Sequence, residues 1–390
     1  MVEDRVIDEI IMNSEDQLKW VKKFKKKRYL YDELLKINKE YYIGIKGVRG
    51  IGKTVLLLQI AQKNKNAVYF SADSAMLKNN SIYEVVKELI KRDIKNIFID
   101  EIHRKINWDV DIKSLYDEHK VRVFFTGSSA LDITKTGADL SRRVVLKELL
   151  PASFREFLNI KKGFDIPVLK LKNILDDKSL VNKYLEAFNF FDEYLKYGGM
   201  LYPKSGFFEA VGNSLRKVIL SDLITLREIN IKYESDIYKL LYFVSKSEPF
   251  EINYSRIANH LDISKNFAIR MVDDLKRAGI LIVIFAEKKK GELRKEPKIY
   301  LTLPLREFLN KGERGLKGAS REEFFVNHLR DVRYLKGKRG EKTPDFKYKK
   351  IIIEIGGESK KKNQNADYIA IDGLSNAGNK VPLFLFGFIY

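Results

Sequence analysis

A glycine-rich segment in the first sixty residues constrains the fold of this chain more than any other stretch. It reads YYIGIKGVRGIGKTVLL over residues 41–57, with an apolar run first and a helix-forming run last. Gly47, Gly52, Lys53 and Thr54 fit the pattern G-x-x-x-x-G-K-(S/T) of a phosphate-binding P-loop. Backbone N–H groups of such a loop and of the following helix point at one spot and favour a phosphate there. The sequence therefore predicts a strand, a phosphate-binding loop and a helix in direct succession.

Each residue of this loop is a candidate ligand of a nucleotide, because the loop backbone surrounds the phosphates. The candidates are Gly47, Val48, Arg49, Gly50, Ile51, Gly52, Lys53, Thr54 and Val55. Lys53 is expected to reach the β- and γ-phosphates, and the Thr54 hydroxyl is expected to coordinate Mg²⁺. The predicted ligands are thus a nucleoside triphosphate and Mg²⁺.

A second motif places two carboxylates at the end of a predicted strand. Residues 96–103 read NIFIDEIH, so an apolar run leads into Asp100 and Glu101, which is the Walker B arrangement. Asp100 at the strand tip can hold the Mg²⁺ shell, while Glu101 can act as the base that polarises the attacking water. A strand that merely ends in exposed acids is the alternative. Together with the P-loop, the motif predicts hydrolysis as well as binding.

Residues 40–150 alternate short apolar strands with helices, which predicts an α/β domain with a parallel sheet covered on both faces. The predicted strands are Tyr41–Lys46, Ala67–Ser71, Asn96–Asp100, Val121–Thr126 and Val144–Leu149. Ser81 and Glu84 form a capping box at the start of one intervening helix. Ser14 and Gln17 carry the same signal, which predicts a helix beginning at Glu15.

Four segments of this domain together resemble a known family. They read GVRGIGKT, FIDEIHRKINW, FFTGSSALDI and LSRRVVLKELLPASFREF. The chain resembles the archaeal and bacterial AAA+-type ATPases, and more narrowly those that carry a C-terminal domain of unknown function related to nucleases. The resemblance is strong from Tyr41 to Leu158 and weak beyond. It implies an ATPase with a helical lid and a central P-loop strand, and it favours ATP over GTP. Some members carry two arginines in the loop, and only Arg49 is present here.

The resemblance also implies two catalytic residues outside the motifs already named. By analogy, the strand in VFFTGSSA lies between the P-loop and Walker B strands, with Ser128 near the γ-phosphate. Thr126 and Ser129 are the alternatives for this sensor. Arg143 matches the family arginine that neutralises charge on the γ-phosphate, in cis or from a neighbouring subunit. Arg142 could take its place.

Beyond Pro151 the helical patterns predict a lid over residues 151–232, and residues 233–312 change character. Three helical segments precede two apolar runs that flank the basic hairpin EKKKGELRKE, which predicts a winged helix-turn-helix. Lys265, Asn266 and Arg270 would then face the major groove of duplex DNA near the start of the third helix. Lys289 and its two lysine neighbours would meet phosphates from the wing.

Two observations oppose that DNA-binding interpretation. Asp273 and Asp274 place acid on the same helix, and winged helices also serve as packing modules.

The whole chain has a net charge of +20 and a pI near 9.6, which favours a polyanionic partner. A heat-adapted composition rich in Lys, Glu and Ile accounts for that charge equally well.

Residues 313–390 predict a small α/β domain. A helix that carries Glu322 or Glu323 precedes strands bearing Asp345 and Glu354. That order resembles the PD-(D/E)xK nuclease fold, in which carboxylates hold Mg²⁺ and a lysine orients the hydrolytic water. Gly356 stands where that lysine is expected, so Lys360 would have to reach in from further along the chain. We therefore expect a structural or DNA-holding role for this domain.

Composition excludes several kinds of site and bears on the location of the protein. The chain of 390 residues contains no cysteine, which excludes disulfides and zinc sites built on thiolates. Neither a signal peptide nor an apolar run long enough to cross a membrane is recognised, so we expect a cytoplasmic protein. The oligomeric state is open, and a homo-oligomer is compatible with an arginine supplied in trans.

These observations lead to one expected function and two alternatives. We expect residues 1–150 to hydrolyse Mg²⁺-ATP and thereby drive or switch a DNA-associated C-terminal half. One alternative is a nucleotide-dependent switch or scaffold that binds proteins and no DNA. The other is a metal-dependent nuclease gated by ATP.

Overall fold

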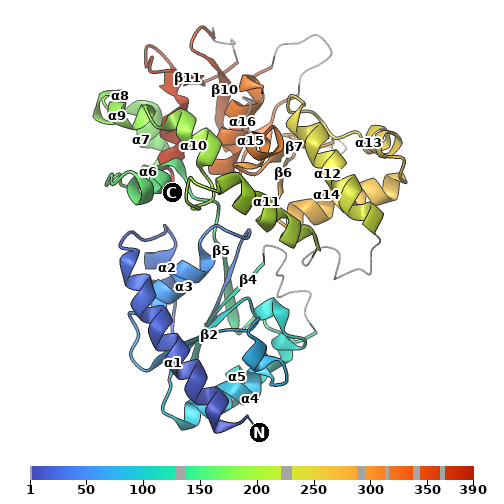
Figure 1. Ribbon diagram of the computed structural model, residues 1–390. Coiled ribbons are helices and arrows are strands. Elements are labelled where there is room, and N and C mark those ends of the chain that lie inside the picture. Colours follow the sequence, from blue (N-terminus) through green and yellow to red (C-terminus); the bar gives the residue numbers. More distant parts are fainter. Residues whose placement is uncertain are drawn as a thin grey trace. The chain divides into compact units, whose positions relative to one another are not determined.

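A computed structural model describes residues 2–128, 137–220, 231–287, 296–311, 316–336, 343–360 and 365–390 (Figure 1). The chain divides into two compact units, Met1–Leu150 and Pro151–Tyr390, which are described in turn. The finer division of the second unit at residues 232 and 312 stays a prediction. No helix within the described ranges has both the length and the apolar character that a membrane crossing requires.

The first unit is built on a five-stranded parallel sheet with the order β2-β3-β4-β1-β5. The strands are β1 (Tyr42–Lys46), β2 (Ala67–Ser71), β3 (Asn96–Asp100), β4 (Arg122–Gly127) and β5 (Val144–Glu148). The predicted parallel sheet is confirmed, with each strand end within one residue of its expected place. β4 lies between β1 and β3, so the P-loop strand is an inner strand and the predicted sensor strand is its neighbour.

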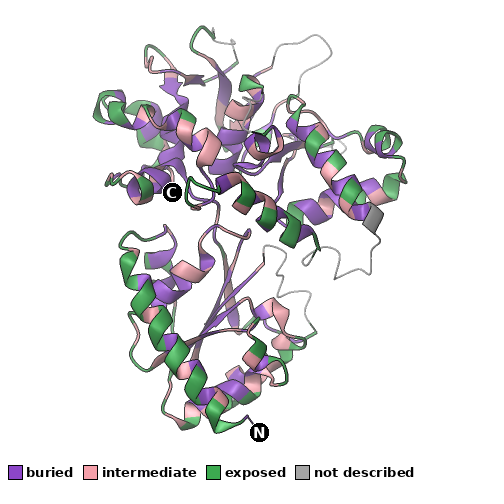
Figure 2. Cartoon of the chain, in the orientation of Figure 1, coloured by how far each residue is buried: buried purple, intermediate pink, exposed green. Residues whose placement is uncertain are grey.

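Helices cover both faces of this sheet. They are α1 (Asp4–Trp20), α2 (Tyr31–Lys36), α3 (Lys53–Ala61), α4 (Ile82–Lys91) and α5 (Trp108–Glu118), with short 3-10 turns at Val21–Lys23, Ala75–Leu77 and Ile102–Arg104. Because strand side chains alternate between faces, one face packs its apolar residues against α1, α4 and α5. On the other face Phe98 stacks on Phe124 with ring centroids 4.9 Å apart. Figure 2 shows the strands buried and the outer helix faces exposed.

The first helix corrects one expectation. α1 continues from Asp4 to Trp20, so Ser14 lies inside the helix and the predicted helix start at Glu15 is wrong. Ser14 is buried, and its Oγ accepts a hydrogen bond from the Tyr69 N–H at 2.9 Å. An edge strand leaves backbone donors unpaired, and Ser14 satisfies one of them on β2. The capping boxes at Ser81 and at Ser153 are both present.

The second unit begins with short helices that build an aromatic core. They are α6 (Phe154–Lys161), α7 (Leu171–Asp176), α8 (Leu180–Lys183), α9 (Leu185–Phe188), α10 (Phe191–Tyr197) and α11 (Phe207–Lys217). The helical pattern between Ser179 and Lys196 is thus divided among α8, α9 and α10. Phe154 and Tyr194 from these helices share one buried core with Phe324 and Phe388 from the end of the chain.

Three helices and a strand pair follow in the predicted order. They are α12 (Ile231–Ser245), α13 (Tyr254–Leu261) and α14 (Lys265–Arg277), then β6 (Leu281–Ile284) and β7 (Lys298–Leu301). Ser264 caps α14 by accepting a hydrogen bond from the Phe267 N–H at 3.2 Å. The antiparallel pairing of β6 and β7 agrees with two strands joined by a hairpin. Lys288, Lys289 and Lys290 in that hairpin lie outside the described residues.

A second five-stranded sheet completes this unit, with the order β12-β11-β10-β9-β8. Its strands are β8 (Arg333–Tyr334), β9 (Phe346–Tyr348), β10 (Ile351–Gly357), β11 (Tyr368–Asp372) and β12 (Lys380–Pro382). α15 (Leu305–Leu309) and α16 (Lys317–His328) precede the sheet, and a 3-10 segment, η5 (Leu383–Phe388), follows it. The sheet is mixed, because β10 is parallel to β11 and antiparallel to β9.

Candidate functional site

The predicted phosphate-binding loop lies between β1 and α3, at the carboxyl end of the sheet. Lys53 is buried, and its Nζ donates hydrogen bonds to the carbonyl oxygens of Gly47 at 2.9 Å and Val48 at 3.1 Å. Gly50 and Gly52 have φ angles of +87° and +93°, which residues other than glycine rarely adopt. The loop thus holds its lysine at its centre, where phosphate oxygens can replace the two carbonyls.

A buried arginine that the sequence did not single out supports this loop. The guanidinium of Arg28 donates to the Ile51 carbonyl and, at 2.7 Å, to the Leu150 carbonyl. Only 5% of Arg28 is exposed. The sequence places it at the end of a basic run that indicates a solvated helix face, so its local pattern carried no signal of burial. Arg28 thereby links the P-loop to the segment after β5.

Asp100 sits at the centre of a hydrogen-bond set that joins three strands and a helix. It accepts from the Thr54 hydroxyl at 2.7 Å, from the Tyr69 hydroxyl at 3.1 Å, and from the Thr126 hydroxyl. Burial raises the pKa of Tyr69, and the charge of Asp100 raises it further, so this hydroxyl stays protonated and remains a donor. The contact of Tyr69 with Asp100 was not predicted. The only indication of it in the sequence was that Tyr69 lies on a neighbouring predicted strand.

Thr54 and Asp100, the two predicted Mg²⁺ ligands, are therefore side by side. A hydroxyl and a carboxylate oxygen at this distance suit Mg²⁺, which usually binds one or two carboxylates together with substrate phosphates and water. No cluster of three or more His, Asp or Glu side chains within the described ranges is placed to hold a metal ion. The hydroxyl and the carboxylate thus fit an ion that also binds the phosphates of a nucleotide.

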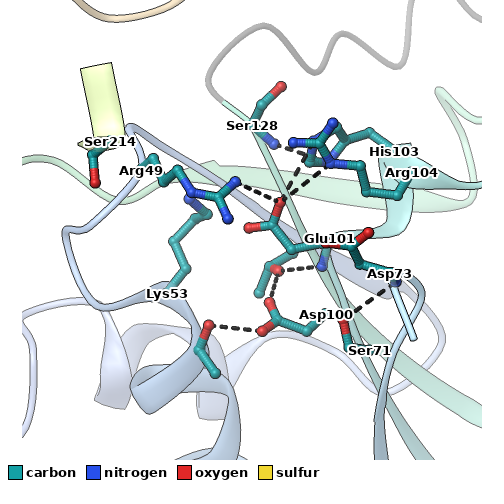
Figure 3. A network of polar contacts seen from close by, with 12 residues as sticks. Arg49, Lys53, Ser71, Asp73, Asp100, Glu101, His103, Arg104, Ser128 and Ser214 are labelled. Carbon is teal, nitrogen blue, oxygen red and sulfur yellow. Dashed lines mark hydrogen bonds and ion pairs between the residues drawn. The ribbon is translucent and has the colours of Figure 1, made fainter. Parts of the chain in front are cut away.

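The predicted base, Glu101, is held in an unusual backbone conformation and surrounded by donors (Figure 3). Its φ angle is +52°, and its N–H donates to the Thr126 Oγ1 at 3.0 Å. One carboxylate oxygen lies 3.6 Å from Arg49 Nη1, 3.6 Å from His103 Nε2 and 4.0 Å from Arg104 Nε. A left-handed residue of this kind is costly and is typical of functional sites.

His103 connects this carboxylate to the predicted sensor. Burial, together with the positive charges of Arg104, Lys53 and Arg49, lowers the pKa of His103 to about 4, so the ring is neutral near pH 7. The Ser128 N–H donates to the ring Nδ1 at 3.3 Å. The single ring proton therefore resides on Nε2, which faces Glu101. Of the alternative sensors, Thr126 is engaged with Asp100 and Ser129 lies outside the described residues.

Arg143 is not brought to the P-loop of its own chain. It directly precedes β5, whose first residue pairs with Tyr42 at the start of β1, so it lies at the opposite edge of the sheet. Its Nε and Nη2 contact Asp117 at 2.8 and 2.9 Å. Arg142 is exposed at the same edge and contacts Asp139 at 3.4 Å. A role in cis is therefore excluded by geometry, and a role in trans stays a prediction.

The predicted DNA contacts on α14 share one exposed surface. Lys265, Asn266 and Arg270 are all exposed near the start of this helix. Asp273 pairs with Arg277 at 2.7 Å, and Asp274 is buried, where it accepts from the Tyr233 hydroxyl at 3.1 Å. Neither acid therefore opposes the charge at the helix start. Lys289 lies outside the described residues.

In the last domain the structure separates the two candidate glutamates. Glu323 is buried and forms a bidentate ion pair with Arg306 at 2.7 and 2.8 Å, which is a structural role. Glu322 accepts from the Tyr300 hydroxyl at 2.9 Å. Burial raises the pKa of Glu322 to about 7, with repulsion from Asp345 adding to the rise and Lys298 opposing it. Glu322 is therefore the member of the predicted carboxylate group.

Lys360 reaches the position that the sequence left without a lysine. Its Nζ lies 3.1 Å from a carboxylate oxygen of Glu354. A Cβ built on Gly356 would lie 2.6–2.7 Å from three carbons of the Lys360 side chain. The lysine thus passes through the space that a side chain at Gly356 would fill. From the sequence it was doubtful that Lys360 could reach Glu354. The turn after β10 brings Lys360 back towards the strand, so its side chain needs to span only a short distance.

The raised pKa of Glu322 predicts a pH-dependent stability. A carboxyl whose folded pKa lies above its unfolded value stabilises the fold below the unfolded pKa, and that contribution is lost as the pH rises through about 7. Glu322→Gln should therefore remove about 2 kcal/mol of the stability difference between pH 5 and pH 8. Thermal unfolding of the parent and the variant at pH 5 and at pH 8 measures this difference in stability. The exposed control Glu186→Gln should leave the difference unchanged, and equal differences in all three proteins would contradict the assignment.

Comparison with known families supports the site in the first unit. Residues 39–158 match the family model described as "AAA domain". That stretch contains the P-loop, the Walker B strand and the predicted sensor strand. The first unit therefore carries the nucleotide-binding fold of the AAA ATPases, as the resemblance implied.

Two uncharacterized archaeal proteins are similar to the chain. MJ1637 of Methanocaldococcus jannaschii is 28% identical over 72% of this chain and 66% of its own length. MJ1544 of the same organism is 35% identical over 40% of this chain and 34% of its own length. The chain thus spans just under two thirds of the first relative and about one third of the second. Neither has an assigned activity.

Solved structures with partial likeness include two proteins with nucleic-acid or nucleotide ligands. The Aeropyrum pernix ORC1 protein in complex with DNA is 13% identical, with a TM-score of 0.30 over 81% of this chain and 94% of that one. AMPPCP-bound DnaA from Aquifex aeolicus is 15% identical, with a TM-score of 0.26 over 64% of this chain and 87% of that one. Scores this low carry no argument about this chain.

Proposed function

We propose that the first unit binds ATP with Mg²⁺ and hydrolyses the bond to the γ-phosphate. The observation that carries this proposal is the position of Glu101. Its carboxylate lies among Arg49, His103 and Arg104, next to the Thr54–Asp100 pair and the P-loop. Binding a phosphate needs only the loop, whereas a second carboxylate held at the strand end suits the activation of water.

Each residue has one task in this proposal. Lys53 exchanges its two carbonyl partners for β- and γ-phosphate oxygens. Thr54 and Asp100 would hold Mg²⁺, which supplies positive charge that offsets the charge developing on the phosphates. Glu101 orients the water and accepts its proton. The sensor role of Ser128 rests on its backbone contact with His103.

Arg49 can pair either with the Glu101 carboxylate or with the γ-phosphate of a bound nucleotide. It lies 3.6 Å from Glu101 and belongs to the loop that surrounds the phosphates. A γ-phosphate carries more charge than one carboxylate, so the guanidinium is expected to turn towards it when ATP binds. That exchange would leave Glu101 with fewer cationic partners, so that its carboxylate is free to contact the attacking water.

Two substitutions separate binding from hydrolysis. Lys53→Ala should reduce ATP turnover by roughly 100-fold or more, because it removes the phosphate-binding charge. Glu101→Gln should retain ATP binding and lose turnover, because an amide cannot take a proton. Nucleotide binding and phosphate release are both measured, with Lys65→Ala and Glu15→Gln, both at exposed positions, as matched controls. Turnover at the parent rate in Glu101→Gln would show that Glu101 is not the base.

We also propose that nucleotide hydrolysis controls a DNA-associated second unit. Support comes from α14, where Lys265, Asn266 and Arg270 are exposed together and the neighbouring acids are paired or buried. The three helices and strand pair around it follow the order of a winged helix. The net charge of +20 suits a polyanionic partner.

Duplex binding tests this part of the proposal. The double substitution Lys265→Gln and Arg270→Gln should weaken duplex binding by roughly tenfold and reduce the salt dependence of the affinity by about two phosphate contacts. Lys172→Gln, in an exposed position on α7, is the control for charge. Titrations at several salt concentrations, together with ATP turnover with and without DNA, measure both effects. Absence of duplex binding at low salt would favour a nucleotide-dependent protein switch.

The C-terminal carboxylates support a second candidate function, metal-dependent cleavage of DNA gated by ATP. Burial and the charge of Asp345 raise the pKa of Glu322, and burial and the charge of Glu354 raise the pKa of Asp345. In the described ranges these carboxylates do not form a group of three placed to hold a metal ion, but Lys360 stands beside Glu354 in place of the expected lysine. In nucleases of this kind, such a lysine orients the attacking water. The position of Lys360 is the one observation that favours cleavage over a structural role.

Cleavage is tested with single- and double-stranded DNA in Mg²⁺ or Mn²⁺, with and without ATP. If the site is active, Glu354→Gln and Lys360→Gln should each abolish cleavage, because one removes a metal ligand and the other the group that positions water. Glu358→Gln, on the turn after β10, is the matched control. No cleavage by the parent chain under any of these conditions would retire this candidate.

A further inference from the structure

A second polar hollow lies at the edge of the first unit's sheet that is opposite to the P-loop. Its volume is about 560 Å³. Asn96 and Arg122, the first residues of β3 and β4, line it together with Tyr42, the first residue of β1. The strands run parallel, so roughly 17 Å of extended chain separates this hollow from the strand ends that face the nucleotide. It is therefore a separate site.

Positive charge dominates the lining of this hollow. The cationic side chains are Lys39, Lys95, Lys120 and Arg122. Lys95 pairs with Asp93 at 3.0 Å, and Glu40 is the single acid in the lining. Within the described ranges, no carboxylate lies at ion-pair distance from Lys39, Lys120 or Arg122. The hollow thus presents a net positive surface, in which Lys95 is the one cation with a carboxylate at ion-pair distance among the described residues.

Arg122 is the cation whose placement most needs an explanation. Its guanidinium is partly buried over the Phe124 ring, 4.7 Å from the centroid. It makes a long hydrogen bond of 3.4 Å to the Ile37 carbonyl, and its buried Nε has no hydrogen-bond partner in the described part of the chain. Withdrawing a guanidinium from water without a carboxylate costs folding stability. A bound anion would offset that cost.

Two further buried polar atoms beside this hollow are also without a described partner. They are the hydroxyl of Tyr42, a residue only 3% exposed, and the Nε2 of His119. Both side chains line the hollow, and both can donate a hydrogen bond. Buried polar groups are almost always paired. Three potential donors gathered at one place indicate an acceptor that binds from outside.

We propose that this hollow binds the phosphate group of an anionic ligand. A phosphate carries up to two charges and several acceptor oxygens, which match the lysines and the planar guanidinium of Arg122 better than one carboxylate does. Arg122 and His119 are both partly exposed, so small rotations bring their donors to the ligand. The phosphate can belong to a free phosphorylated compound or to a nucleic-acid backbone.

Pyrophosphate binding to the full chain tests this proposal by calorimetry. The Lys53→Ala background removes the P-loop lysine, so the result does not depend on ATP hydrolysis. In that background we expect one bound pyrophosphate per chain, with the affinity lowered at least tenfold by Arg122→Gln. The double substitution Lys39→Gln and Lys120→Gln, at exposed positions, should lower it similarly without disturbing the core. Lys91→Gln on α4 removes the same charge elsewhere and should change nothing.

The competing outcomes are distinct. Displacement of pyrophosphate by a single-stranded thymidine octanucleotide would identify a nucleic-acid backbone as the source of the phosphate. Failure of the oligonucleotide to displace it would identify a free phosphorylated compound. No pyrophosphate binding, or equal affinity in the Arg122 and double-lysine variants, would overturn the proposal. So would equal, Arg122-dependent binding of a glutamate octapeptide, because the hollow would then select charge and not phosphate.

Discussion

The hydrogen bond between Thr54 and Asp100 is the interaction on which the site in the first unit depends. It joins the first turn of α3 to the end of β3, although 46 residues separate the two along the chain. The same carboxylate accepts from Tyr69 and Thr126, so side chains from β2, β3 and β4 meet at one group. Such an arrangement is available only because the strands are parallel and their carboxyl ends share one edge. Helix, loop and base are therefore positioned by a single acid.

In the proposed function, the charges around Glu101 connect nucleotide binding to hydrolysis. The base is surrounded by cations and a neutral histidine, and one of those cations belongs to the phosphate-binding loop. A phosphate that attracts Arg49 also changes the electrostatic environment of the base. His103 extends the network to the backbone of Ser128 on the neighbouring strand. The proposed roles in phosphate binding, sensing and water activation would thus share one set of contacts.

The second unit solves a different problem, which is how short helices form a core. Short helices at its start and the last residues of the chain contribute to the same aromatic cluster. A buried Arg306–Glu323 pair ties α15 to α16, and Glu323 also accepts from a backbone N–H of β7. Removing either partner of such a pair leaves an uncompensated buried charge. Glu323 is thereby committed to structure, which leaves Glu322 as the candidate for the proposed nuclease site.

The sequence by itself determined the P-loop, the Walker B carboxylates, the five strands and their parallel direction, because these follow from local spacing and from the alternation of strands and helices. The order of helices and strands around α14 was also readable from periodicity. Tertiary structure alone decided the burial of Arg28 and Ser14, the contact of Tyr69 with Asp100, and the reach of Lys360 over Gly356. It also placed Arg143 at the edge opposite to the nucleotide. A polar residue looks the same in sequence whether it is solvated or buried, and only the chain that folds over it supplies the partner that distinguishes the two.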